Sequence, residues 1–400
     1  MVDHAQDSSP SESLANLAAL LETYASGSGR ITPRVRGSRL SPDARDMLEE
    51  AVAATESAVK DAVPAQELLV FANGCYAVGR HAEASEVYLT ILENEPANAD
   101  ARFNLGLAYL RLRSPEDAVR EFTDVLVQNP LLAEAFYQRG NGNDDLGQTE
   151  QALADYSRAI ELDPEYVHAM YNRGILLAQA DRHHEAVAQF DKVNDIRPDI
   201  SNAYLNRGAS LDELGLHAEA ISSYTKATEL NPENSLALFN RARTNYYLGN
   251  LQESLTDYNE VIGLTPDDAE AFNNRGLTFD ALKDYENAIK DFDSALDLRP
   301  EFAEAHSNRG AVLEIMGDLE GALEQYKHSL EVDPGMASAH YNAARLYSRT
   351  GNVTACLMHL DHVLQIAPEW ANDAAHDEHL SWALEMRDLR HENEDQANGG

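Results

Sequence analysis

The sequence predicts an all-α fold, a solenoid in which nine 34-residue helix-turn-helix units stack on one another. Nine prolines recur at a fixed interval, at residues 96, 130, 164, 198, 232, 266, 300, 334 and 368. When each proline is numbered as position 32 of a repeat, position 8 is Gly or Ala in all nine repeats, and position 24 is aromatic in all but the last. Such self-similarity indicates a repeat architecture, in which each unit buries its apolar face against its neighbours.

Each repeat contains two amphipathic segments, named helix A and helix B here, which are separated near position 15. Position 15 is Gly in six repeats, and Gly readily takes the left-handed conformation that ends a helix. The proline at position 32 cannot continue helix B, because it lacks an N–H group. Small residues at positions 8 and 20 let the two helices approach, and the aromatic residue at position 24 fills the space beside them. We therefore expect repeats to start at residues 65, 99, 133, 167, 201, 235, 269, 303 and 337.

The segments outside the repeats are expected to cap the array. Ser41 and Pro42 have the residue types of a helix N-cap and first helical position. Leu14, Leu17, Leu21 and Tyr24 lie on one stripe of an earlier short helix. The expected organisation is residues 1–40 as a short helix at about 11–25 and a flexible linker, 41–64 as a capping helix, 65–370 as repeats, 371–390 as one or two C-terminal capping helices, and 391–400 as a disordered tail.

The composition bears on partners and location. The 400 residues carry a formal net charge of −37, with 68 acidic against 31 basic residues. This sign repels nucleic acid and anionic lipid and attracts basic partners, although solubility or a saline habitat would favour it too. No apolar run is long enough to cross a bilayer, no secretory signal is evident, and Cys75 and Cys356 give no disulfide framework. We expect a cytoplasmic protein that binds neither nucleic acid nor membrane.

The pattern of small residues at positions 8 and 20, an aromatic residue at 24 and Pro at 32 resembles the tetratricopeptide repeat. The resemblance extends from residue 65 to about residue 370 and returns nine times in one register. It implies a right-handed superhelix that displays helix A on its concave side. It also implies a protein-binding module, and the sequence shows no nucleophile–base pair or phosphate loop. We therefore expect no catalytic activity and no cofactor.

Position 6 of helix A carries a row of amides. On a helix wheel, positions 2, 6, 9 and 13 lie opposite the apolar face at positions 4, 8 and 11, so they face the groove. A carboxamide both donates and accepts hydrogen bonds, so a row can bind the main chain of an extended peptide. The row is similar to the Asn ladder of O-linked N-acetylglucosamine transferases, although no transferase domain fits here. Asn that meets only water or neighbouring backbone is the alternative. The row is Asn104, Gln138, Asn172, Asn206, Asn240, Asn274, Asn308 and Asn342.

Acidic residues outnumber basic ones on or beside this face, and aromatic residues at position 5 flank it. The groove acids in the predicted site are Asp212, Glu270, Asp280 and Glu304. We expect a non-catalytic scaffold or adaptor that binds an extended, basic peptide. The alternative is a self-assembling subunit of a larger complex, and the oligomeric state stays open.

The linker arginines Arg30, Arg34, Arg36 and Arg39 form the only basic cluster of the chain. Three interpretations stay open: the cluster docks in the protein's own groove, it binds an acidic partner, or it is solvated and flexible.

Position 7 is Arg in six repeats, at the edge of the core face, where a buried guanidinium needs a partner. In three of these repeats position 23 on helix B is Asp, which predicts three pairs but no universal one. The predicted pairs are Arg139–Asp155, Arg241–Asp257 and Arg275–Asp291.

Two further stretches carry weaker hypotheses. Cys356, His359 and His362 are metal-ligand types at i, i+3 and i+6, but Cys356 occupies a small core position, so no metal site is predicted. Gly142 and Asn143 are poor helix formers within a predicted helix A, which suggests a locally weak repeat or a hinge.

Overall fold

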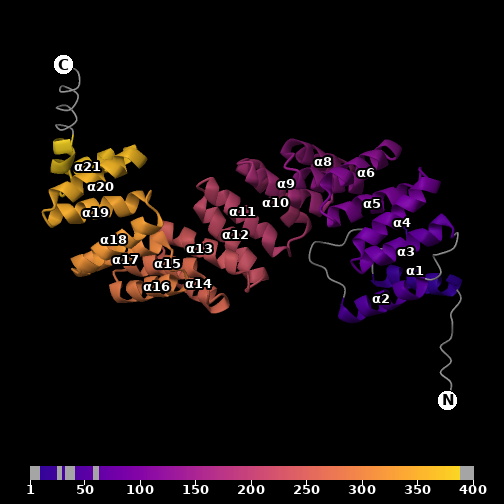
Figure 1. The fold of residues 1–400 in the computed structure, drawn as a ribbon, viewed down its shortest axis with the longest axis horizontal. Helices are drawn as coiled ribbons and strands as arrows, with labels where there is room; N and C mark the ends of the chain where they lie inside the picture. Colours follow the sequence, from indigo (N-terminus) through magenta and orange to yellow (C-terminus); the bar gives the residue numbers. More distant parts are fainter. Residues whose placement is uncertain (1–9, 25–28, 32–40, 57–62, 388–400) are drawn as a thin grey trace, which may run out of the picture. The chain divides into compact units, whose positions relative to one another are not determined.

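The computed structural model describes residues 10–24, 29–31, 41–56 and 63–387, and every regular element in these ranges is helical (Figure 1). The chain forms two compact units, residues 1–210 and 211–400, and the boundary falls within one helix. The first unit contains α1 (Pro10–Tyr24), α2 (Pro42–Glu56), α3 (Ala65–Ala77), α4 (His81–Asn94), α5 (Ala99–Arg111), α6 (Pro115–Gln128), α7 (Ala133–Asp145), α8 (Thr149–Leu162), α9 (Val167–Gln179), α10 (His183–Ile196) and most of α11 (Ser201–Glu213).

The second unit continues with further helix pairs and a short C-terminal group. Consecutive helices pack on one another from α3 to α10 in the first unit and from α12 to α20 in the second. The nine A helices begin at the nine expected repeat starts, which confirms the predicted fold class. The elements are α12 (His217–Leu230), α13 (Ser235–Tyr247), α14 (Leu251–Leu264), α15 (Ala269–Ala281), α16 (Tyr285–Leu298), α17 (Ala303–Met316), α18 (Leu319–Val332), α19 (Ala337–Arg349), α20 (Val353–Ile366), the 3₁₀ turn η2 (Pro368–Trp370), α21 (Ala371–His376) and a helical stretch over 381–387.

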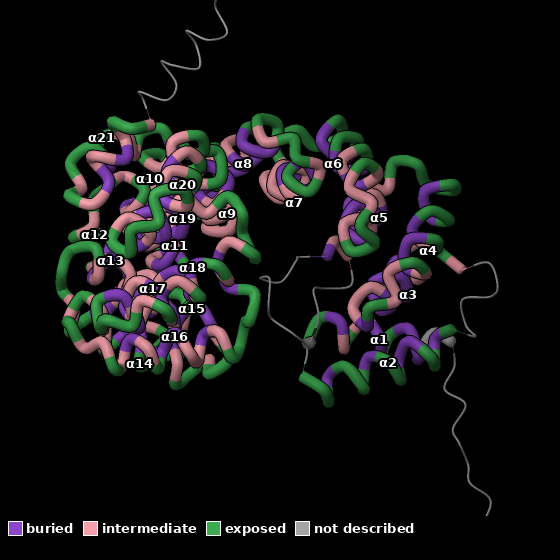
Figure 2. Tube along the Cα trace, turned by 60° about the vertical axis from the view of Figure 1, so that its left-hand side comes forward, coloured by how far each residue is buried: buried purple, intermediate pink, exposed green. Residues whose placement is uncertain are grey.

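The core follows the repeat positions. Buried and exposed residues alternate along the helices, as amphipathic helices require (Figure 2). The ring at position 24 is fully buried in eight repeats, and in five of them it lies directly against the glycine at position 8. A Cβ atom on Gly174 would lie 2.8 Å from the Phe190 ring, so the close approach depends on the missing side chain. None of the helices within the described ranges is both long and apolar enough to cross a membrane.

Position 15 adopts the left-handed conformation even where it is not glycine. Gly249 has φ 78°, and Arg113, Asp181 and Lys283 have φ 60°, 57° and 63°. A residue with a Cβ atom is strained there by roughly 1–2 kcal/mol. The interhelix turn therefore imposes this backbone on whichever residue occupies the position.

Helices α1 and α2 pack against each other and against α3 at one end of the repeats. Leu17 of α1 and Leu48 and Val52 of α2 are buried in one cluster with the core of the first repeat. At the other end, Leu380 packs against Leu360. Residues 57–62 of the expected capping helix 41–64 lie outside the described residues. The Tyr24 side chain and residues 388–400 lie outside them too.

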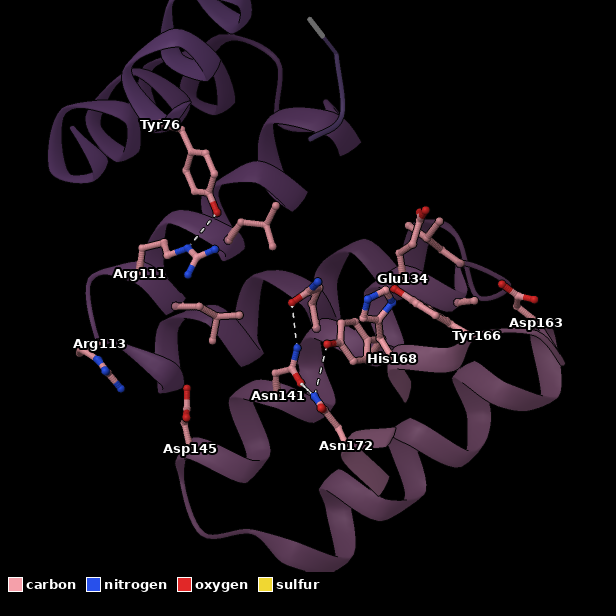
Figure 3. A pocket seen from close by; sticks show the side chains of 16 residues that line it. Tyr76, Arg111, Arg113, Glu134, Asn141, Asp145, Asp163, Tyr166, His168 and Asn172 are labelled. Carbon is pink, nitrogen blue, oxygen red and sulfur yellow. Dashed lines mark hydrogen bonds between the residues drawn. The ribbon is translucent and has the colours of Figure 1, made fainter. Parts of the chain in front are cut away.

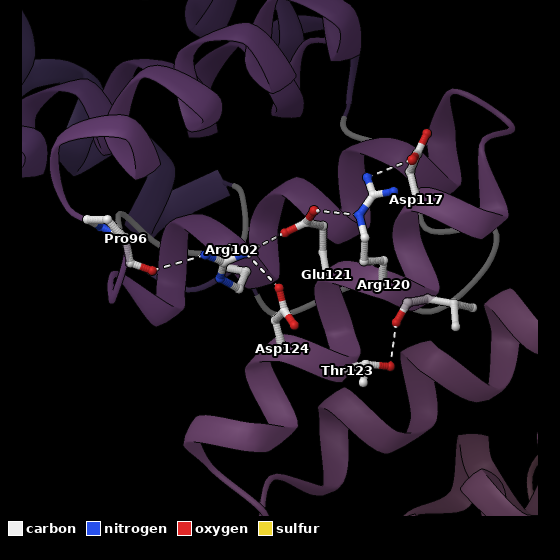
Figure 4. Close-up of polar contacts among 8 residues, drawn as sticks. Pro96, Arg102, Asp117, Arg120, Glu121, Thr123 and Asp124 are labelled. Carbon is white, nitrogen blue, oxygen red and sulfur yellow. Dashed lines mark hydrogen bonds and ion pairs between the residues drawn. The ribbon is translucent and has the colours of Figure 1, made fainter.

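Polar residues at position 4 tie helix A to the preceding proline. Arg102 donates to the Pro96 carbonyl at 3.0 Å and to Glu121 and Asp124 on α6 at 2.9 and 3.1 Å (Figure 4). His306 makes the same contact with the Pro300 carbonyl at 3.0 Å. The residue six positions after the repeat proline thus provides a donor to the proline carbonyl, which lies in the turn after helix B.

His340 repeats this contact within a histidine cluster. Its Nε2 donates to the Pro334 carbonyl at 3.0 Å, so in the neutral ring Nδ1 accepts, and His359 Nδ1 donates to it at 2.8 Å. His362 stacks on His340, and Tyr347 stacks on His359. Burial lowers the pKa of His340, and burial together with the neighbouring His340 lowers the pKa of His359 to about 4.

The three predicted Arg–Asp pairs are confirmed. Each is bidentate, with N–O distances between 2.7 and 2.9 Å for Arg139–Asp155, Arg241–Asp257 and Arg275–Asp291. The remaining arginines at position 7 use position 25 of the preceding helix B instead. The contacts are Arg173 to Ser157 at 3.0 Å, Arg207 to Asp191 at 2.6 Å and Arg309 to Asp293 at 2.7 Å.

The suspected weak stretch of α7 is helical and packed. A Cβ atom on Gly142 would lie 2.8 Å from Val119 Cγ2, so glycine permits the approach of α6. Asn143 is buried and donates to Asp155 at 2.9 Å. Both residues therefore have structural roles that explain their presence in a helix.

Candidate functional site

The first unit binds a segment of its own chain on the inner face of α3 and α5. The Gly29 carbonyl accepts hydrogen bonds from Asn73 Nδ2 at 2.7 Å and Asn104 Nδ2 at 3.0 Å. The Ile31 amide donates to Asn104 Oδ1 at 2.9 Å. One side-chain amide of the predicted row therefore holds the main chain of this segment, which bends at Gly29 and Arg30, at two points.

The side chains of this segment also have partners. Arg30 Nε donates to Asp100 Oδ1 at 3.0 Å, and its guanidinium lies 4.0 Å from Glu134 and 5.5 Å from the centre of the Phe103 ring. Ile31 is 3% exposed and packs in one cluster with Phe103. Of the three interpretations of the linker, docking in the protein's own groove is the one found for Arg30.

The other linker arginines, Arg34, Arg36 and Arg39, lie outside the described residues.

A buried network orients the two amides that hold the segment. Asn73 Oδ1 accepts from the Tyr88 hydroxyl at 2.7 Å and from Asn104 Nδ2 at 2.9 Å. With the segment in place, Asn73 and Asn104 are 1% and 0% exposed, and their bonds to Tyr88 and to each other orient the two amides. Asn73, at position 9, was absent from the predicted site. The sequence feature that marks it is Asn at position 9 together with Tyr at position 24 of the same repeat.

The same network recurs two repeats later, beside a cavity of about 630 Å³ (Figure 3). Asn141 Oδ1 accepts from the Tyr156 hydroxyl at 2.9 Å and from Asn172 Nδ2 at 2.9 Å. Asn141 Nδ2 donates to Gln138 Oε1 at 3.0 Å, and Asn172 Nδ2 also lies 3.3 Å from the Tyr137 hydroxyl. Asn141, Asn172 and Gln138 all line the cavity.

The cavity wall is aromatic and mixed in charge. Tyr137, Tyr166 and His168 cluster with ring centres 5.1 to 6.4 Å apart. Burial raises the pKa of Tyr166 and lowers the pKa of His168, so both favour their neutral forms. The charged residues of the wall are Arg111, Arg113, Glu134, Asp145 and Asp163.

The rest of the predicted row divides into two groups. Asn206 donates to the Tyr171 hydroxyl and Asn308 to Asn273 Oδ1, both at 3.0 Å. Each thus contacts position 5 of the preceding repeat. In the second group the half-buried side chains have no hydrogen bond within the part of the chain that is described; these are Asn240, Asn274 and Asn342. Asn342 lines a separate cavity of about 330 Å³ in the second unit.

Asp212, the first of the predicted groove acids, is engaged by its own unit. Its carboxylate accepts from Thr244 at 2.6 Å and from Tyr224 at 2.9 Å, and it lies 3.0 Å from His217 Nδ1. These contacts give the Asp212 carboxylate a structural role.

The other three predicted acids differ in their surroundings. Asp280 is half-buried, and burial raises its pKa. Glu270 is exposed and pairs with Arg299 at 3.2 Å, whereas Glu304 is exposed.

The histidine-rich helix α20 shows no metal cluster among the residues that the structure describes. Cys356 lies in the core, where burial raises its pKa to about 11, and His359 faces His340.

Comparison with protein families gives consistent matches along the repeats. Models described as a tetratricopeptide repeat match residues 69–133, 201–234, 269–302 and 303–336, and a model described as a TPR repeat matches 145–181 and 242–283. Together these matches cover more than half of the chain. None of the proteins with curated descriptions matches it.

Solved structures resemble the chain in fold. The C-terminal part of a TPR repeat-containing protein from Cytophaga hutchinsonii is 20% identical, with a TM-score of 0.52 over 60% of this chain and 98% of that chain. A tetratricopeptide repeat protein from Parabacteroides merdae is 22% identical, with a TM-score of 0.46 over 62% and 98%. YrrB, described as a TPR protein with an unusual peptide-binding site, is 27% identical, with a TM-score of 0.43 over 46% and 95%.

Proposed function

This chain belongs to the tetratricopeptide-repeat family, whose members generally mediate protein–protein interactions, and from that premise we propose that it is a non-catalytic scaffold for a partner protein. Its ligand is an extended, basic segment of the partner. The amides on the inner face of the A helices bind the main chain of that segment, and acidic residues bind its basic side chains.

The contact between Asn104 and the main chain of Gly29–Ile31 carries this proposal. Asn104 accepts from one peptide N–H and donates to a carbonyl two residues earlier, so both bonds are to main-chain groups and need no particular side chain. A partner segment in the same conformation would make the same two bonds. Arg30 supports the basic character of the ligand, because it lies between Asp100 and Glu134.

The proposed site includes the rest of the row as further main-chain contacts. Asn240, Asn274 and Asn342 have amides without a hydrogen bond in the described part of the chain, so a ligand would satisfy them without displacing a protein group. Asp280, Glu270 and Glu304 stay in the proposal as acids that favour a basic ligand. Asp212 has its carboxylate engaged by Thr244 and Tyr224 and contributes by charge alone.

The test uses the chain's own segment as the probe. A labelled peptide with the sequence of residues 26–33, SGSGRITP, is titrated into full-length Ile31→Asp protein, in which a buried charge detaches the internal segment. We expect binding by fluorescence anisotropy, weakened about tenfold or more by a second substitution, Asn104→Ala, because two hydrogen bonds are lost. Asn94→Ala, on the exposed face of α4, is the matched control.

Salt and mass measurements complete this test. The affinity should fall as salt rises, because Arg and acid pairs on a surface are screened. Absence of binding to Ile31→Asp protein, or binding indifferent to Asn104→Ala, would refute the proposal. A mass by light scattering that rises with concentration would instead favour a self-assembling subunit.

A further inference from the structure

We infer that the cavity in Figure 3 contains a second main-chain binding site, formed by Asn141 and Asn172, for an extended peptide with an uncharged residue at the place that Arg30 holds in the first site. This inference rests on the proposed function. The inference adds to the proposed function a second point of attachment for the peptide and a different side-chain preference.

The two amide networks are equivalent by position. Asn73, Tyr88 and Asn104 each have a counterpart of the same residue type 68 residues later, which is two repeats. The hydroxyl–amide distance is 2.7 Å in the first network and 2.9 Å in the second, and the amide–amide distance is 2.9 Å in both. The second network therefore presents its amides in the arrangement that binds Gly29–Ile31 in the first.

Side chains take the place of the peptide in the second network. Where Asn73 donates to the Gly29 carbonyl, Asn141 donates to Gln138 Oε1 at 3.0 Å. The Asn172 amide likewise meets the Tyr137 hydroxyl at 3.3 Å, a long contact. A peptide carbonyl entering the cavity would replace both acceptors and restore the geometry of the first site.

The acceptor atom of Asn172, Oδ1, differs from its counterpart in the first network. Its counterpart, Asn104 Oδ1, accepts from the Ile31 amide, whereas no donor to Asn172 Oδ1 is found among the residues described. Asn172 is half-buried and lines the cavity. A half-buried acceptor without a partner is stabilised by any ligand N–H that reaches it.

The charge beside the amides differs between the two sites. The residues two repeats after Asp100 and Glu134 are His168 and Asn202. His168 packs against the rings of Tyr137 and Tyr166, and burial favours its neutral form. The two acids that hold Arg30 are thus replaced by neutral groups, so an uncharged residue, such as Gln, suits this place better than Arg.

The experiment compares two peptides on the wild-type full-length chain, whose first site is filled by its own segment. The probes are labelled SGSGRITP and SGSGQITP, and their binding is measured by fluorescence anisotropy. We expect the Gln peptide to bind with a stoichiometry of one and more tightly than the Arg peptide. Asn172→Ala should weaken binding about tenfold or more and Asn141→Ala about fivefold, following the number of bonds lost, with Asn94→Ala unchanged.

A gain of affinity separates this role from a folding defect. Gln138→Ala removes the side chain that competes for Asn141, so the Gln peptide should bind about fivefold more tightly. Unchanged or weaker binding to Gln138→Ala protein, or equal binding of the two peptides, would overturn the inference. If neither peptide binds wild-type protein but SGSGRITP binds the Ile31→Asp variant, the second site fails while the proposed function stands. If no peptide binds either protein, both fail.

Discussion

The bidentate pair between Arg275 and Asp291 should be energetically coupled, and the coupling can be measured by a double-mutant cycle. Arg275 donates to both Asp291 oxygens at 2.7 Å, and the side chains are 18% and 7% exposed. Arg275 also donates to Asn259 at 2.6 Å and lies over the rings of Phe272 and Phe279. The pair therefore joins α15 to α16 in one repeat and reaches the helix B before it.

The two single substitutions should differ in size. Arg275→Ala leaves a nearly buried carboxylate without its cation, which costs about 3 kcal/mol, the low end for a buried pair because water reaches the arginine side. Asp291→Ala leaves Arg275 with Asn259 and two ring faces, so we expect a loss of about 2 kcal/mol. The double variant should lose about 3 kcal/mol, which gives a coupling free energy of about 2 kcal/mol.

The cycle is measured by urea unfolding with circular dichroism, and the four proteins must share one m value. Because repeat arrays need not unfold in one step, hydrogen exchange of α15 and α16 amides gives the local free energy of opening. The control is Arg309–Asp293, whose aspartate is 49% exposed and whose coupling should stay below about 1 kcal/mol. A coupling below about 0.5 kcal/mol for the first pair would refute the reasoning.

Three further predictions concern the turn, the core and the histidine cluster. Lys283→Gly relieves left-handed backbone strain and should raise the free energy of urea unfolding by about 0.5–1 kcal/mol. An unchanged free energy of unfolding would contradict the strain. Gly276→Val places a branched side chain where even a Cβ atom would lie 2.8 Å from the Phe292 ring, and should cost about 2 kcal/mol in a thermal melt. Burial and His340 lower the pKa of His359 to about 4, below its unfolded value, so stability is present above about pH 6.5 and falls by about 1.4 kcal/mol per pH unit towards pH 4. His359→Gln should flatten the pH dependence of the free energy of unfolding, measured by urea titrations at several pH values. If the variant loses stability as steeply as the wild type, the dependence comes from another group.

The repeat register could be predicted because it depends on local rules that recur nine times. Proline ends helix B, and a left-handed residue ends helix A, so the starts of the A helices follow from the spacing. The pair Arg275–Asp291 could be predicted for the same reason, because both partners belong to one repeat. Arg207 and Arg309 were not assigned partners, because their acceptors lie on the preceding helix B, across a junction that the wheel of one repeat does not show.

The binding of Gly29–Ile31 could not be predicted, because a Gly-containing, Arg-containing linker has the same composition whether it is solvated or docked. Its docking depends on a three-dimensional match between Asn73, on α3, and Asn104, on α5. Asn at position 6 recurs in most repeats and therefore forms a visible pattern, whereas Asn at position 9 occurs in only two repeats. In both repeats that have Asn at position 9, position 24 is Tyr, and this combination marks the two networks.

The buried hydroxyl at position 24 links core packing to the inner face. A buried tyrosine hydroxyl needs a hydrogen-bond partner, whereas Phe292 needs none. In the first unit Tyr88 donates to Asn73, whose amide nitrogen stays available for a main-chain carbonyl. In the second unit Tyr224 donates to Asp212, and a carboxylate has no hydrogen to offer such a carbonyl. The residue that satisfies the core tyrosine thus decides whether its repeat gains a second main-chain donor besides position 6. This favours the two repeats with Asn at position 9, both in the first unit, as the principal anchors of a bound peptide.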